Sequence, residues 1–194
     1  MAADGNRTAD GDGKNDKPLD IELRSSNVVC AGSATAHVCR VIAHRAGAYA
    51  PGISEFVFSS LNQRFYGSSI EGVEHWFRSA GADLYAHGYR LSARRIAFRT
   101  PMITKWVAAG DGFRGAVLTT DGTRFHNGRV GPDDDAHAVG LVLAAGAKKK
   151  KSGLQLVDPW PNVEHKRAPD KDILEKAHRD RKYGTVVIYW SGHS

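Results

Sequence analysis

Three residues that could act together in catalysis stand at the ends of apolar segments of the chain. Cys30 begins a run with helical spacing, His137 begins an apolar strand, and Asp158 ends the next one. A thiol becomes a nucleophile at neutral pH when its position favours the thiolate, an imidazole takes its proton and a carboxylate holds that imidazole. Because side chains from distant segments converge at the ends of elements, the three positions predict a cysteine hydrolase.

The chain contains two cysteines, and their positions on the same expected helix separate their roles. A helix N-terminus supplies roughly half a positive charge, which favours a thiolate at Cys30. Cys39 lies about 180° around the helix at 100° per residue, so we expect it to be a buried, inert thiol. Cysteine is among the most buried residue types, and a core position for Cys30 is the alternative on position alone.

Among nine histidines, His137 is the one that begins a strongly apolar strand, over residues 137–144. His37 and His44 fall near the Cys30 face of the helix. They lie about 10 Å and 20 Å along its axis at 1.5 Å per residue, too far to reach the thiol. We expect both to be surface or packing residues.

The expected strands 137–144 and 154–158 flank a turn, so antiparallel pairing is the natural arrangement. Pairing would bring Asp158, at the end of one strand, beside His137, at the start of the other. A carboxylate in that place would fix the tautomer and orientation of the imidazole. Taken alone, the Asp158-Pro159 step also suits the start of a loop, and this alternative stays open.

The remaining elements indicate an α+β fold with helices in the first half and an antiparallel sheet in the second. Residues 1–19 are polar and form an expected disordered tail, and 20–194 form one domain. Segment 54–65 is apolar, but its pattern does not identify one kind of element. The stretches 46–68 and 83–100 are expected loops, and they carry no diagnostic pattern. The expected helices cover 30–45, 68–81, 101–110 and 173–182, and the expected strands cover 115–120, 137–144, 154–158 and 185–190.

Bulk composition limits the partners and the compartment. The net charge of +6 favours acidic surfaces in general, but without a nucleic-acid-binding pattern we expect no nucleic-acid partner. Two cysteines without C-x-x-C spacing favour a reducing compartment. The sequence has no cluster of ligands with zinc-type spacing, so we expect no metal and no other cofactor. No segment has the length of a membrane span or of the apolar core of a signal peptide. One basic turn is expected to be solvated or to touch an anionic surface: Lys148, Lys149, Lys150 and Lys151.

The three motifs together resemble the papain-like cysteine peptidases. Cys30 stands at a helix start, residues 137–140 (His-Ala-Val-Gly) at a strand start, and residues 157–160 (Val-Asp-Pro-Trp) after the following strand. Within that superfamily they look closest to bacterial double-glycine leader peptidase-like proteins and to effector proteases of pathogens and symbionts. The resemblance covers most of residues 21–194.

The resemblance implies a peptidase that acts on a peptide or protein through a thioester acyl-enzyme. It makes Cys30 the nucleophile, His137 the general base and acid, and Asp158 the orienting residue. It also implies a cytoplasmic protein, or one secreted without a cleaved signal peptide into a reducing host compartment.

Two positions depart from the papain pattern. Arg24 occupies the place of the glutamine that donates to the oxyanion, which leaves Asn27 as the nearest candidate amide, and Ala31 replaces the usual glycine. A missing oxyanion donor can cost about 10²–10³ in rate. Two alternatives stay open: a catalytically inactive papain-like binding module, and a peptidoglycan amidase or endopeptidase, or a glutamine deamidase, with the same triad.

Overall fold

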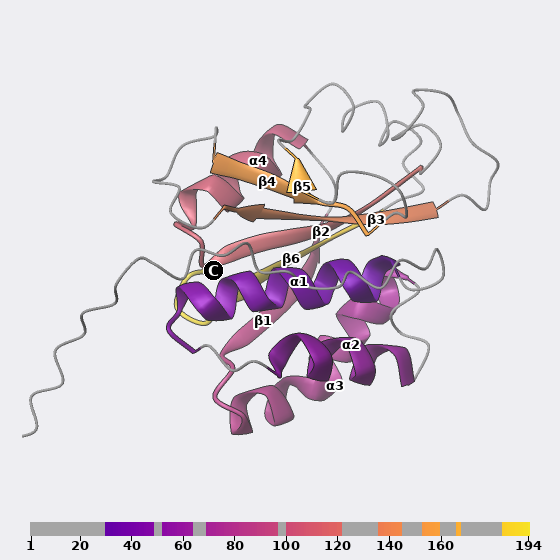
Figure 1. Cartoon of the computed structure of the whole chain (residues 1–194), viewed down its shortest axis with the longest axis vertical. Helices are drawn as coiled ribbons and strands as arrows, with labels where there is room; N and C mark the ends of the chain where they lie inside the picture. Colours follow the sequence, from indigo (N-terminus) through magenta and orange to yellow (C-terminus); the bar gives the residue numbers. More distant parts are fainter. Residues whose placement is uncertain are drawn as a thin grey trace, which may run out of the picture.

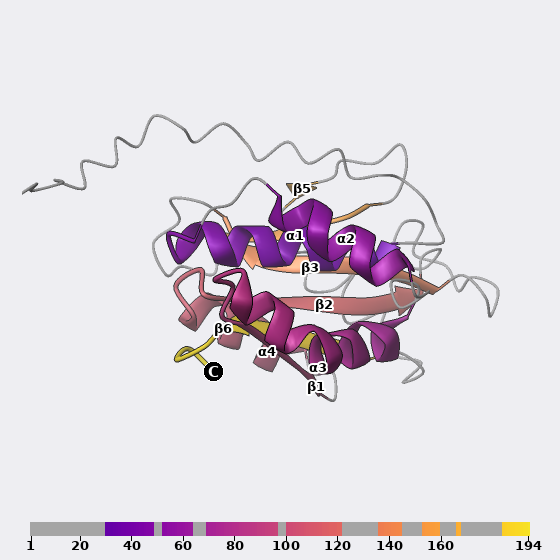
Figure 2. The ribbon, with the colours of Figure 1, turned by 90° about the horizontal axis from the view of Figure 1, so that it is seen from below.

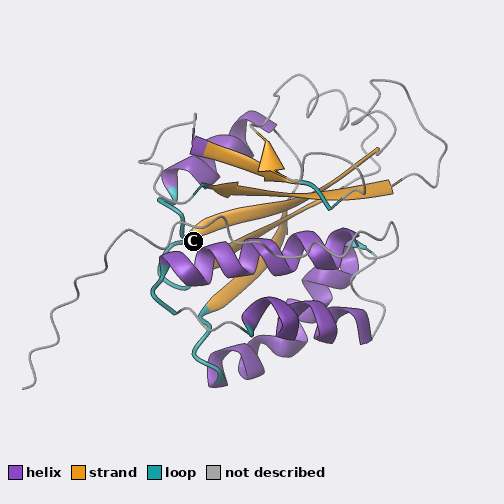
Figure 3. Ribbon diagram, viewed as in Figure 1, coloured by secondary structure: helices purple, strands orange, loops and turns teal. Residues whose placement is uncertain are grey.

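The computed structural model describes residues 30–48, 52–63, 69–96, 100–121, 136–144, 153–159, 166–167 and 184–194. Its helices are α1 (Cys30–Arg45), α2 (Ile53–Gln63), α3 (Ile70–Ala86) and α4 (Thr100–Ala109). Its strands are β1 (Leu91–Ile96), β2 (Arg114–Asp121), β3 (Ala136–Leu143), β4 (Leu154–Val157), β5 (Lys166–Arg167) and β6 (Thr185–Trp190). The expected α+β class is confirmed (Figure 3).

The described strands form one six-stranded sheet in the order β1-β6-β2-β3-β4-β5. Every neighbouring pair is antiparallel. The strand latest in the sequence, β6, therefore lies between β1 and β2, one strand in from the edge of the sheet. Helices α1, α2 and α3 lie on one face and α4 lies on the other (Figures 1 and 2).

The sheet is buried on both faces, which explains why β3 reads as an unbroken apolar run rather than an alternating one. Ala138 and Val142 belong to the core beneath α1, α2 and α3. Val139 and Leu141 belong to the second core, beneath α4. Successive side chains of β3 thus serve opposite cores, as the period of two requires.

Helix α1 lies against β3 where the strand carries a glycine. A β-carbon at Gly140 would lie 3.0 Å from Val38 Cγ2 and 3.5 Å from the carbonyl oxygen of Ala34. The absence of a side chain at Gly140 therefore lets the helix backbone approach the strand closely.

The structure corrects the expected boundaries of α3. Its N-cap is Ser69, whose side chain accepts a hydrogen bond from the backbone N–H of Gly72, so the helix begins later than the expected start at residue 68. The helix also passes through Gly81 and continues to Ala86, because Leu84 keeps its apolar face buried. Gly88, with a φ of +81°, adopts the left-handed conformation that follows many helix ends.

The stretches expected to be loops contain regular structure. Residues 53–63, within the ambiguous segment, form α2, and residues 91–96 form β1. Strand β1 precedes α4, so helices and strands alternate more than the expected order of helices first and sheet second. The tail 1–19, the basic turn 148–151 and the expected helix 173–182 lie outside the described residues.

Candidate functional site

Helix α1 runs in the same direction as β3, and this sets the level of Cys30. At its far end, Arg45 forms an ion pair of 3.1 Å with Asp111, which precedes β2, the antiparallel neighbour of β3. At mid-length, Ala34 lies over Gly140. The four helical residues back from Ala34 span about 6 Å, and the two strand residues back from Gly140 span about 6.6 Å. Cys30, the first residue of α1, consequently lies level with Ala138, the neighbour of His137, and α1 and β3 begin on the same side of the molecule (Figure 1).

His137 and Asp158 form the direct contact of the site. His137 Nε2 lies 2.7 Å from Asp158 Oδ1. The two side chains are 1% and 0% exposed, so the contact is shielded from water. A carboxylate in this position fixes which ring nitrogen carries a proton and holds the ring plane.

The strand register shows how Asp158 reaches the imidazole. Pairing of β3 with β4 ends at Gly140 and Val157. Continuing that register places Asp158 opposite Val139, two positions from His137. The sequence had suggested that Asp158 lies directly beside His137. Diagonal neighbours in an antiparallel pair are within reach of long side chains. Here the imidazole of His137 is long enough to reach the carboxylate of Asp158.

Cys30 is the third member of the cluster. Its thiol lies close enough to His137 to raise the pKa of the imidazole. Since Nε2 faces Asp158, Nδ1 is the ring nitrogen that remains to take the proton of the thiol. The structure thus brings together the three residues that the sequence singled out.

The environment of His137 favours its charged form. Burial lowers the pKa of His137, whereas hydrogen bonds to Asp158 and Cys30 and the charges of both groups raise it. The combined effect raises the pKa from 6.5 to about 9. At neutral pH the ring is therefore an imidazolium that can form ion pairs with its neighbours.

Thr120 is a neighbour of the site that the sequence did not single out. It is the partner of His137 in the β2–β3 register and is 2% exposed. Its pairing fixes the backbone from which the imidazole projects. The sequence carries no signal for this role, because the register between β2 and β3 cannot be read from either strand alone.

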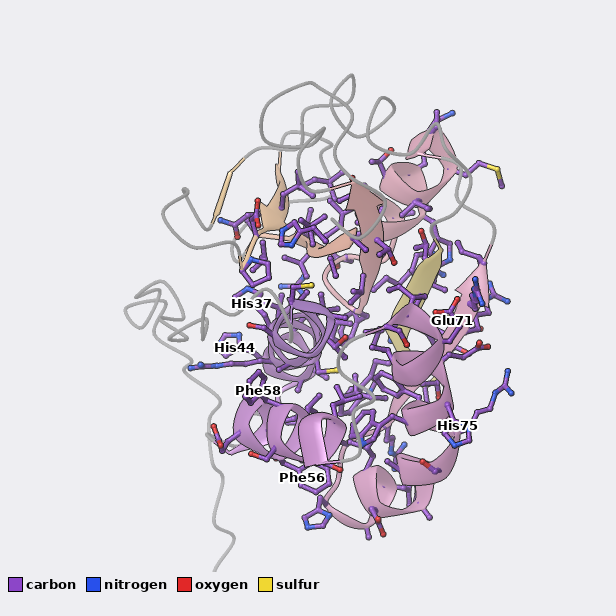
Figure 4. All side chains as sticks on the ribbon, turned by 90° about the vertical axis from the view of Figure 1, so that its right-hand side faces the viewer. His37, His44, Phe56, Phe58, Glu71 and His75 are labelled. Carbon is purple, nitrogen blue, oxygen red and sulfur yellow. The ribbon has the colours of Figure 1, made fainter. Side chains whose placement is uncertain are left out.

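The other expectations for α1 agree with the structure. Cys39 is fully buried, and burial raises the pKa of its thiol. His37 is a buried packing residue and His44 is exposed. Both extend from the side of α1 turned away from α3 (Figure 4). Arg24 and Asn27, the residues expected near the oxyanion, lie outside the described part of the chain.

Comparisons of the chain with protein-family models, with curated proteins and with solved structures found no match. Among the described helices, none is long and apolar enough to span a membrane. The fold and the site define an α+β domain with a buried Cys–His–Asp cluster between a helix start and a sheet.

Proposed function

We propose that the protein is a papain-like cysteine hydrolase that cleaves a peptide or protein substrate. The observation that carries this proposal is the position of His137, whose Nε2 lies 2.7 Å from Asp158 Oδ1 and whose pKa is raised by the neighbouring Cys30 thiol. The start of α1 adds a second favourable feature. Its first backbone N–H groups have no partner within the helix, and its dipole favours negative charge at Cys30.

The acylation half of the reaction uses the charged pair. The Cys30 thiolate attacks the substrate carbonyl carbon, and the electron pair of the carbonyl moves to its oxygen. The free N–H groups at the start of α1 are oriented to stabilise that oxyanion. His137 gives its proton to the leaving amine as the C–N bond breaks, which leaves a thioester and a neutral imidazole.

The deacylation half restores the enzyme. Neutral His137 takes a proton from water, and the resulting hydroxide attacks the thioester carbonyl. The C–S bond breaks, a carboxylic acid leaves, and the thiolate and imidazolium form again. Asp158 keeps the ring in one orientation through both halves and stabilises each imidazolium, without itself taking up a proton.

The test is cleavage of a peptide library, read by mass spectrometry, with Cys30→Ala and Cys39→Ala compared with the unmodified protein. We expect new peptide termini with the unmodified protein and with Cys39→Ala, and none with Cys30→Ala. Cys39→Ala is the matched control because it removes the other thiol of the same helix. Conversion of a glutamine amide to a carboxyl group, seen as replacement of NH2 by OH with release of ammonia and without chain cleavage, would instead identify a deamidase.

A second measurement separates an active thiol from an inactive binding module. Iodoacetamide at pH 6 reacts with a thiolate paired to an imidazolium and leaves ordinary thiols largely unmodified. We expect selective alkylation of Cys30 in the folded protein. Equal, slow alkylation of both cysteines together with no cleavage would contradict the proposal.

A further inference from the structure

A concave surface lies between α3 and β1, on a part of the protein that the proposed reaction does not use. It encloses about 220 Å³. We refer to it as the β1 groove. Its lining residues are Phe77, Arg78, Gly81, Tyr85, Tyr89, Arg90, Leu91, Ser92, Ala93 and Ser191.

The β1 groove is remote from Cys30. Ser92, in the groove, is level with Tyr189 and thus with Arg114 at the start of β2. His137 is level with Thr120, near the other end of β2. Six residues of strand separate the two levels, which corresponds to about 20 Å. A ligand in the groove therefore cannot touch the cysteine cluster unless it is long.

The groove borders an edge that is unpaired in the described part of the sheet, because β1 is the first strand in the order of the described strands. The backbone N–H of Ser191 donates to the carbonyl of Arg90, which shows that Arg90 faces β6. The backbone N–H of Arg95 instead points outward and donates to Glu74 Oε1 at 3.4 Å. Backbone direction alternates along an antiparallel strand, so Leu91 and Ala93 also point outward.

The outward groups of Leu91 and Ala93 have no hydrogen-bond partner within the described part of the chain. Glu74 closes the edge at Arg95, so the open portion is short and coincides with the groove. Unpaired N–H and C=O groups on an edge strand are the groups that an added strand uses.

The groove combines an apolar floor with two arginines, of which Arg78 forms an ion pair of 2.8 Å with Glu74. Phe77 and Leu91 supply buried apolar surface, and Tyr85 is 66% exposed. The guanidinium of Arg90 lies 5.9 Å from the centre of the Tyr85 ring. Within the described residues it has no carboxylate partner, and no acidic residue lines the groove. The charge of the rim therefore suits a carboxylate, which guanidinium groups bind through paired hydrogen bonds.

We propose that the β1 groove binds an extended peptide segment that carries acidic side chains, separately from the cysteine site. The peptide adds to the free edge of β1 through Leu91 and Ala93, one apolar side chain enters the groove, and a neighbouring carboxylate binds Arg90. Strand addition accounts for the open backbone groups, and the charged rim accounts for the acidic preference.

The test uses the full chain carrying Cys30→Ala, so that binding is measured without cleavage and independently of the proposed catalysis. The probe is a short fluorescein-labelled peptide that alternates glutamate and leucine, followed by fluorescence polarisation. Two matched probes replace every glutamate by glutamine, or methylate the backbone nitrogens on one edge of the peptide. We expect each change to weaken binding about tenfold or more, because each removes charged or backbone hydrogen bonds.

Protein variants locate the site. Gly81→Leu should abolish binding while the melting temperature stays the same or rises, because a β-carbon at Gly81 meets no atom within 4 Å and α3 gains a better helix former. Arg90→Gln should weaken binding about tenfold, whereas Arg94→Gln, an equal loss of charge outside the groove, should have a much smaller effect.

Three results would overturn the proposal. The first is no rise in polarisation with the glutamate peptide. The second is binding that Gly81→Leu leaves unchanged. The third is a pair of results: free glutamate or acetate competes as strongly as the unlabelled peptide, and the N-methylated probe binds as well as the unmethylated one. That pair would make the groove a site for small carboxylates.

Discussion

Val38 on α1 lies directly over Gly115 on β2, and a β-carbon at position 115 would come within 2.6 Å of Val38 Cγ1. The same valine lies over Gly140 on β3. These two glycines let the helix rest close to the sheet, and that separation sets the height at which Cys30 meets His137. The geometry of the candidate site therefore depends on residues well away from the reacting atoms.

Gly115→Ala tests this dependence. We expect it to lower the free energy of unfolding by about 1–3 kcal/mol, because the added methyl group forces α1 or Val38 to move. We also expect slower alkylation of Cys30 as the thiol moves from the imidazole. Adding Val38→Ala should restore part of both losses, measured as a positive coupling in a double-mutant cycle. Additive effects of the two changes would show that the contact does not set the helix position.

Asp158→Asn should reduce turnover far more than it reduces stability. In a serine-protease triad the equivalent change costs about 10⁴ in turnover, and an imidazolium paired with a thiolate should need the carboxylate less. The alkaline limb of kcat/KM should also move to lower pH, because the charge of Asp158 helps to raise the pKa of His137. Full turnover in Asp158→Asn, with none in His137→Ala, would leave a Cys–His pair and reduce Asp158 to a structural residue.

Stability should decrease as the pH rises from about 6.5 to about 9. The pKa of His137 in the folded protein is raised to about 9 from the ordinary value of 6.5. Its contribution is therefore fully present below the lower value and is lost as the pH rises through the higher one. Urea unfolding at several pH values should show this slope, and His137→Gln should remove most of it. An unchanged slope in the variant would assign the effect to other groups.

Cys39 should resist alkylation until the protein unfolds. Its side chain is fully buried and burial raises the pKa of its thiol, so the reactive thiolate is scarce in the folded state. Mass spectrometry of tryptic peptides follows both cysteines in one sample, with Cys39 as the internal control for Cys30. Alkylation of Cys39 at the rate of Cys30 in the folded protein would contradict the assigned orientation of α1.

The sequence predicted the parts of the fold that rest on local patterns. Apolar runs bounded by turns marked β2, β3, β4 and β6, and the expected helix 68–81 overlaps the first part of α3. The contact of His137 with Asp158 was predicted from their placement at the ends of strands that follow one another in sequence. Such pairing needs only a turn and a register.

Features that depend on tertiary packing were not predicted. Strand β1, with Arg94 and Arg95 in its centre, lacks the apolar pattern of a strand, and its partner β6 is distant in sequence. The end of α3 was placed too early because Gly81 is tolerated inside a helix whose apolar face continues to Leu84. The partnership of Thr120 with His137 likewise depends on a register that no local pattern states.

The position of β6 between β1 and β2 has a consequence for how the domain forms. Strands β1 and β2 do not pair with each other, and both depend on residues 185–190 to join them. The helix that carries Cys30 and the strand that carries His137 can be made early in synthesis, but the sheet beneath them stays in two parts until that late segment is present. Contacts between distant segments slow folding. The order of synthesis therefore postpones assembly of the complete sheet until after every residue of the cysteine cluster has been translated.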